Sequence, residues 1–121
     1  MDKAQAFNAF WNGYTWKAYE QNTVPDTAQT PYITYEYAEG FIGDTLPLAA
    51  SLWDRSTSWA TIEAKAQAIA SDIGYGGKVV NYDGGKLWIR RGATFAQRMS
   101  EASDREMRRI LINIIVEYIS A

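Results

Sequence analysis

Three carboxylates lie close together in the sequence and are the first candidates for acid–base chemistry. Glu36, Glu39 and Asp44 fall at the end of one β-prone run. Two carboxylates serve as general acid and general base only when a fixed separation keeps one protonated and the other ionised. The spacing of these three fixes no such separation, and acidic residues are common on turns and solvent-facing strands. We therefore expect no catalytic residue in this cluster.

Two glycine-rich segments were considered as ligand-binding loops. Gly74–Lys78 (GYGGK) resembles a phosphate-binding loop, but it lacks the Walker spacing and the terminal Ser or Thr. Glycines at this point are better explained as the end of a helix. Asp83, followed by two glycines, supplies one carboxylate, which is too few for an acidic calcium loop. We expect no metal and no cofactor.

The chain contains no histidine and no cysteine. Without histidine there is no conventional Ser-His-Asp triad, no imidazole base near neutral pH and no histidine-ligated zinc. Without cysteine there are no disulfides and no thiolate nucleophile. An enzyme of this composition would have to use carboxylates, Lys, Tyr or an oxygen-bound metal. Because the motifs above supply no such site, composition and motifs together predict a protein that is not an enzyme.

Charge is distributed unevenly along the 121 residues. Residues 1–77 carry four Lys/Arg and nine Asp/Glu, a net charge of −5, whereas residues 78–121 carry eight and five, a net charge of +3. This asymmetry describes either two differently solvated surfaces or an acidic and a basic side suited to docking neighbouring copies. Arg90, Arg91 and Arg98 are among the arginines that could contact nucleic acid. The overall pI of about 5.1 argues against a dedicated nucleic-acid binder.

The stretch Leu46–Gly74 is the clearest structural unit. Its first residues alternate apolar and polar as a strand does, and residues 58–73 then repeat apolar side chains every three or four positions, as a helix does. Thr57 and Ser58 offer hydroxyls for the N-cap, and Gly74 stands where helices commonly end.

The N-terminal part is predicted to be a helix over residues 2–14 followed by an extended arm over residues 15–31. The arm lacks periodicity and contains Pro25, yet Trp16 and Tyr19 are aromatic residues that tend to anchor on another surface. We expect Trp16 and Tyr19 to contact either the chain's own core or a neighbouring chain.

The remaining segments are predicted to form strands. Tyr32–Phe41 is expected to pair with the strand that begins at Leu46. Lys78–Tyr82 and Lys86–Arg91 are expected to form a hairpin. Gly92 is expected to end the second strand of this hairpin, before a short strand over Ala93–Met99. The β-branched run that ends at Tyr118 indicates a central strand. The prediction is a single α+β domain, residues 1–121. Its core, residues 32–121, holds a mainly antiparallel sheet of about four to six strands, with two helices packed against the sheet. No apolar run approaches the ~20 residues that cross a bilayer, so no membrane contact is expected.

Several of these segments, in this order, resemble the tail-terminator family of long-tailed bacteriophages, which are small tail-completion or head–tail joining proteins also described as minor capsid proteins. The segments that carry the resemblance are YITYE (Tyr32–Glu36), SLWDRSTSWATIEAKAQAIASDIG (Ser51–Gly74), YDGGKLWIRRG (Tyr82–Gly92), FAQRM (Phe95–Met99) and RRILINIIVEY (Arg108–Tyr118).

The resemblance implies a structural virion protein of the phage neck, assembled in the host cytoplasm. Such a protein forms a homo-oligomeric ring, commonly a hexamer, that caps the completed tail tube. The ring contacts the tail tube protein and the head connector protein, and genomic DNA passes through its lumen. Under this hypothesis Trp16, Tyr19 and Pro25 lie at the subunit interface, and Arg90, Arg91 and Arg98 contact a partner or face the lumen.

Two alternatives remain open. In the first alternative, the chain is another component of the phage neck: a connector adaptor, a stopper or a tail tube subunit. Otherwise it would be a small monomeric module that binds a ligand or glycan through Trp16, Trp53 or Trp88.

Overall fold

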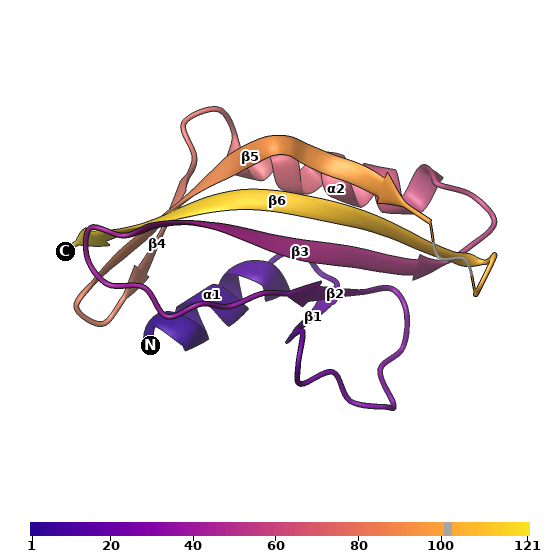
Figure 1. Cartoon of the computed structure of the whole chain (residues 1–121), viewed down its shortest axis with the longest axis horizontal. Coiled ribbons are helices and arrows are strands. Elements are labelled where there is room, and N and C mark those ends of the chain that lie inside the picture. Colours follow the sequence, from indigo (N-terminus) through magenta and orange to yellow (C-terminus); the bar gives the residue numbers. More distant parts are fainter. Residues whose placement is uncertain (101–102) are drawn as a thin grey trace.

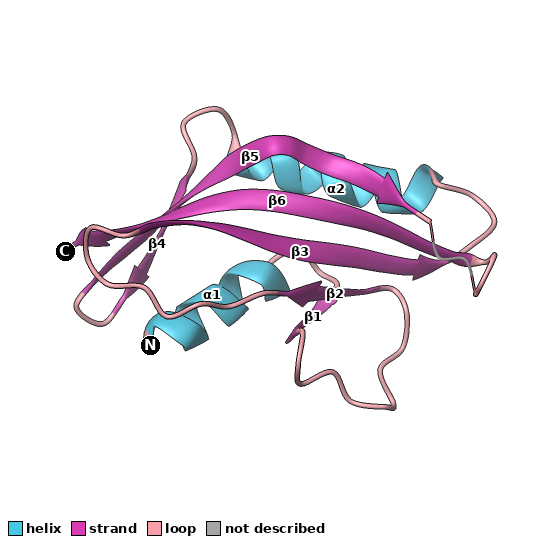
Figure 2. Cartoon of the chain, viewed as in Figure 1, coloured by secondary structure: helices cyan, strands magenta, loops and turns pink. Residues whose placement is uncertain are grey.

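One six-stranded sheet and two helices make up the computed structural model, which describes residues 1–100 and 103–121 (Figures 1 and 2). In chain order the elements are α1 (Lys3–Asn12), β1 (Lys17–Glu20), β2 (Tyr32–Tyr35), β3 (Thr45–Arg55), α2 (Ala60–Ile73), β4 (Lys78–Tyr82), β5 (Gly85–Met99) and β6 (Met107–Ser120). The strands lie in the order β1-β2-β3-β6-β5-β4, and all pairs are antiparallel except β1 with β2. The predicted α+β fold is confirmed.

The centre of the sheet is formed by β3 and β6. They pair along the full length of β3, and β5 covers the other edge of β6. Alternate residues of β6 are buried because one face of the strand meets the helices. These residues are Ile110, Ile112, Ile114, Val116 and Tyr118. The prediction of a central C-terminal strand is confirmed.

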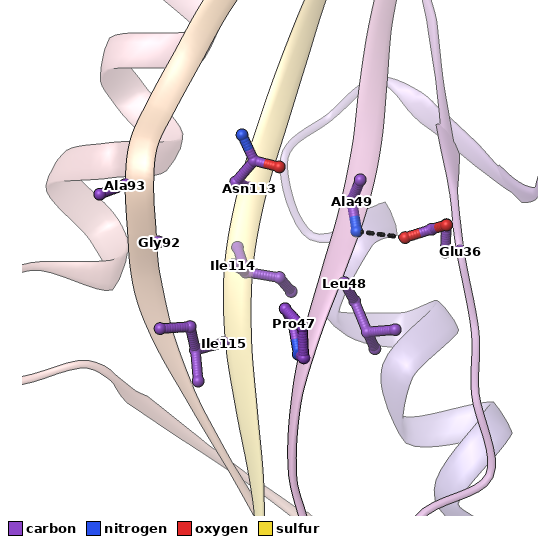
Figure 3. Close-up of a pocket in the computed structure, with 9 residues that line it drawn as sticks. All are labelled: Glu36, Pro47, Leu48, Ala49, Gly92, Ala93, Asn113, Ile114 and Ile115. Carbon is purple, nitrogen blue, oxygen red and sulfur yellow. Dashed lines mark hydrogen bonds between the residues drawn. The ribbon is translucent and has the colours of Figure 1, made fainter.

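Both helices cover the same face of the sheet. α1 buries an aromatic stripe and α2 an aliphatic one, and all of these residues join one core. The α1 stripe is Phe7, Phe10 and Trp11; the α2 stripe is Ile62, Ala66, Ile69 and Ile73. The sheet curls so that α1 contacts both edge strands, β1 and β4. Within residues 1–100 and 103–121 the opposite face of the sheet carries no helix, and Figure 3 looks onto it with both helices behind the strands.

The helix ends differ slightly from the prediction. α1 is closed by a capping box in which the Asp2 carboxylate accepts from the Gln5 amide and the Gln5 side chain accepts from the Asp2 amide. Before α2, Trp59 takes the N-cap position without a side-chain cap, and Ser58 Oγ instead accepts from the Ala60 amide. α2 ends at Gly74 as predicted, with φ of 68°.

Three predicted segments differ from the structure. The segment 15–31 is not an extended arm throughout, because Lys17–Glu20 forms β1 in parallel with β2. The residues between these strands, 21–31, form a loop that extends away from the sheet (Figure 1); we call it the projecting loop. Gly92 does not end a strand either, since β5 continues to Met99 and absorbs a register shift between Arg91 and Ala96. β2 is also shorter than predicted and ends at Tyr35.

Candidate functional site

The three clustered carboxylates each stabilise local backbone or a neighbouring side chain. The pairs are Glu36 with the Ala49 amide at 2.6 Å, Glu39 with the Tyr37 hydroxyl at 2.6 Å and Asp44 with the Phe41 amide at 2.8 Å. Glu39 also forms an ion pair with Lys3 at 2.9 Å. The hydrogen bonds from Tyr37 and Lys3 lower the pKa of Glu39, which favours the ionised form and not a proton donor.

The part of the chain that the structure describes contains no group of three or more His, Cys, Asp or Glu side chains placed to hold a metal ion. In the same residues, no helix is both long and apolar enough to cross a membrane.

Trp16 packs on its own chain. Its half-buried indole lies beside α2, with the Lys65 ammonium 5.4 Å from the ring. Lys65 also donates to the Tyr14 carbonyl at 2.8 Å and to Thr15 Oγ1 at 2.9 Å, which ties the end of α1 to α2. Trp16 therefore contacts the core of its own chain, which is one of the two surfaces considered for it.

Tyr19 and Pro25 lie in different surroundings. Tyr19 is in β1, and its ring meets the Tyr32 ring edge-on at 6.0 Å. Pro25 is exposed in the projecting loop, where its carbonyl accepts from the Ala28 amide. The projecting loop is therefore the only part of the predicted arm, within the described residues, that extends away from the sheet.

The three candidate arginines all lie in β5, each stacked on an aromatic ring. The ring partners are Trp88 for Arg90, Tyr75 for Arg91 and Trp59 for Arg98, at 4.2, 4.6 and 4.8 Å from the ring centroids. Arg90 also pairs with Glu117, and Arg98 with Glu63 on α2. Two of the three cations are thus balanced by carboxylates of the same chain.

A second polar network joins α1, α2 and β4. The Asp72 carboxylate accepts from Lys78 at 2.6 Å and from the Tyr14 hydroxyl at 2.8 Å. The hydrogen bond from Lys78, and after it the bond from Tyr14, lowers the pKa of the Asp72 carboxyl. Burial raises the pKa of the Tyr14 hydroxyl. The network fixes the end of each helix relative to the edge of the sheet.

The helix-free face carries an aromatic ladder that the sequence analysis did not assign. Tyr19, Tyr32 and Trp53 follow one another across β1, β2 and β3, and the Arg109 guanidinium of β6 stacks on Trp53 at 4.9 Å. Trp53 Nε1 donates to Thr34 and Arg109 Nε donates to Ser51, so both groups are held in place. The signal in the sequence is the second face of each strand, which alternates with the core face.

Shallow hollows flank this ladder. One, shown in Figure 3, has a volume of about 250 Å³. It lies where small residues of β3 and β5 leave space around Asn113, whose amide donates to the Thr94 carbonyl. Its lining is Glu36, Pro47, Leu48, Ala49, Gly92, Ala93, Asn113, Ile114 and Ile115. A neighbouring hollow of about 160 Å³ shares Glu36 and Ala49 and reaches Arg109. Both hollows are smaller than the ~300–1,000 Å³ clefts that usually enclose small ligands, and the first includes no residue of the aromatic ladder.

The acidic and basic parts of the sequence fall on different strands of the sheet. Residues 18–54, which include β2 and nearly all of β1 and β3, contain six Asp/Glu and no Lys or Arg. β4 and β5 together contain five Lys/Arg and no Asp or Glu. Since β1 and β4 are the two edge strands, Glu20 and Asp26 of the acidic segment lie beside one edge, and the basic strands β4 and β5 lie at the other. Asp54 is buried in the internal strand β3, and Glu39 pairs with Lys3, so these carboxylates do not belong to the β1 edge.

No protein-family model, curated protein or solved structure matches the chain. The function is therefore inferred from these surfaces and from the sequence segments quoted above.

Proposed function

We propose that this chain is a structural protein of the neck of a long-tailed bacteriophage. Copies of it form a closed ring, a hexamer in the simplest case, that caps the completed tail tube and presents a surface to the head connector. The protein is then a part of the virion and has no catalytic role.

The observation that carries this proposal is the separation of charge across the sheet. A ring requires head-to-tail contacts, in which two different surfaces of each subunit meet. Glu20 of β1 and Asp26 in the projecting loop supply an acidic surface beside one edge, and β4 with β5 supplies a basic surface at the other. Opposite charges on the two surfaces favour this pairing and disfavour contact between like edges.

The state of the arginines agrees with passage of DNA through a lumen. A channel that conducts DNA should not bind phosphates tightly, because each phosphate contact strengthens binding through counterion release. Arg90 and Arg98 are paired with Glu117 and Glu63, and the whole chain has a net charge of −2. Strong retention of DNA is not expected from such a surface.

The test is assembly on tail tubes. The purified chain is mixed with tubes polymerised from the tail tube protein of a long-tailed phage, and separately with head connectors. Mass photometry and electron microscopy then report free rings and capped tube ends. We expect closed rings or capped tubes; a chain that stays monomeric with both tubes and connectors present contradicts the proposal. Rings that bind connectors but not tubes would assign the chain to another position in the neck.

The aromatic ladder favours a second candidate, a monomeric module that binds a glycan or another small ligand. Trp53 lies in this ladder and is its natural fluorescent reporter. Titration with oligosaccharides should then give a saturable change in tryptophan fluorescence that is lost in Trp53→Phe. A ring component without a ligand site should show no saturable change.

A further inference from the structure

The outer edge of β5 is open over much of its length. β4 pairs with β5 only from Gly85 to Ile89, so within the described residues the backbone edge of Arg91–Met99 has no neighbouring strand. Most side chains from Ala93 to Arg98 are exposed. An unpaired strand edge is a template for pairing with another chain. We call residues 91–99 the open β5 edge.

Further features mark the open β5 edge as a contact surface. Tyr75 is fully exposed, and the guanidinium of Arg91 stacks on its ring at 4.6 Å. Tyrosine and arginine are the residue types enriched among binding hot spots. Beside the edge, a hollow of about 240 Å³ between α2 and β5 is lined by Ala66, Gln67, Ala96 and Arg98, among others.

The projecting loop has the complementary properties. Residues 21–31 are mostly exposed and contain Asp26 but no Lys or Arg, and Glu20 precedes them directly. Figure 1 shows this loop at the bottom of the molecule and β5 along the top. One chain therefore does not bring its own loop to its own β5 edge, but two copies in a head-to-tail arrangement do.

We propose that the projecting loop of one copy docks on the open β5 edge of the next copy. The loop lies along the unpaired backbone of residues 91–99, and Asp26 meets the positive charge of Arg91. The inference rests on the proposed ring, because a repeating contact between two different surfaces is what closes a ring.

Cysteine cross-linking tests the geometry, since the native chain has no cysteine. Thr27→Cys in the projecting loop and Ala96→Cys in the open β5 edge are made as separate variants and mixed under oxidising conditions. We expect a covalent dimer from the mixture and not from either variant alone. Thr45→Cys is the control for Ala96→Cys, because Thr45 is exposed at the start of β3, and its mixture with Thr27→Cys should not cross-link.

A charge exchange tests the energetics by mass photometry of the oligomer. Asp26→Arg and Arg91→Glu should each weaken assembly at least tenfold, and the double variant should recover most of that loss. Neither residue is in the core, so circular dichroism of both variants should match that of the native chain.

The outcomes separate this inference from the proposed function. Rings that form without the Thr27–Ala96 cross-link, or that tolerate both charge changes, overturn the docking and leave the ring proposal standing. Cross-linked dimers of Ala96→Cys alone indicate a symmetric contact and overturn it too. Failure of the native chain to form any oligomer, with tubes and connectors present, overturns the ring proposal itself.

Discussion

At the scale of single residues, Gly40 shows how a loop is fixed by its contact with the core. The ring of Tyr118 packs against Gly40, and its hydroxyl donates to the Ala38 carbonyl at 2.8 Å. A Cβ added at Gly40 would lie 2.2 Å from Tyr118 Cε2. Because Tyr118 is almost fully buried, its ring has little room to move.

We therefore expect Gly40→Ala to lower the free energy of unfolding by about 1–3 kcal/mol, the usual range for overpacking. Urea denaturation measures this change. Gly76→Ala is the matched control, since a Cβ there meets nothing within 4 Å, and its effect should stay within about 1 kcal/mol. Equal losses in both variants would contradict the steric explanation.

At the scale of elements, α1 is held in the curl of the sheet by its aromatic residues. Trp11 is fully buried and contacts the rings of Phe10 and Tyr35, with centroids 4.9 and 6.4 Å away. Its indole Nε1 has no hydrogen-bond partner in the described part of the chain. The contribution of Trp11 is therefore packing, reduced by the desolvation of an unpaired donor.

This balance predicts different effects for two substitutions at the same site. Trp11→Ala should destabilise the chain by about 3–5 kcal/mol, as large-to-small changes of buried aromatic residues do. Trp11→Phe keeps an aromatic ring and removes the unpaired donor, so it should cost less than half as much. Thermal and urea unfolding measure both. A Trp11→Phe variant as unstable as Trp11→Ala would contradict this balance of packing and desolvation.

At the scale of the whole molecule, the net charge of −2 is the sum of acidic and basic surfaces. An acidic surface lies beside β1, and a basic one lies at the opposite edge, on β4 and β5. Glu20 and Asp26 are far in sequence from the basic strands β4 and β5 and lie beside the opposite edge of the sheet. Attraction between these edges in neighbouring copies would be electrostatic at long range, whereas the exposed Tyr75 and Val79 would add apolar contact.

Assembly should consequently weaken as salt concentration rises. The Debye length falls from about 10 Å at 0.1 M to about 3 Å at 1 M ionic strength, so contacts between exposed charges are screened over this range. Sedimentation velocity in sodium chloride between these limits should show a shift from rings towards monomers. An unchanged distribution would indicate that apolar contacts alone hold the copies together.

The sequence by itself determined the local elements and the class of fold. Local patterns were sufficient to predict α2, its end at Gly74 and β6, because such patterns depend on neighbours a few positions away. For α2 the pattern is the spacing of apolar residues, and for β6 it is the run of alternating β-branched residues. The sequence also placed one candidate residue on the correct element, because Arg90 lies in β5, which includes the second strand of the predicted hairpin.

Only the tertiary structure decided the pairing of distant segments. It placed β1 beside β2, kept β5 continuous past Gly92 and set Trp16 against α2. It also brought Tyr32, Trp53 and Arg109 together on the open face. Such contacts join residues far apart in the chain, and their free energy comes from packing and hydrogen bonds that no local pattern encodes.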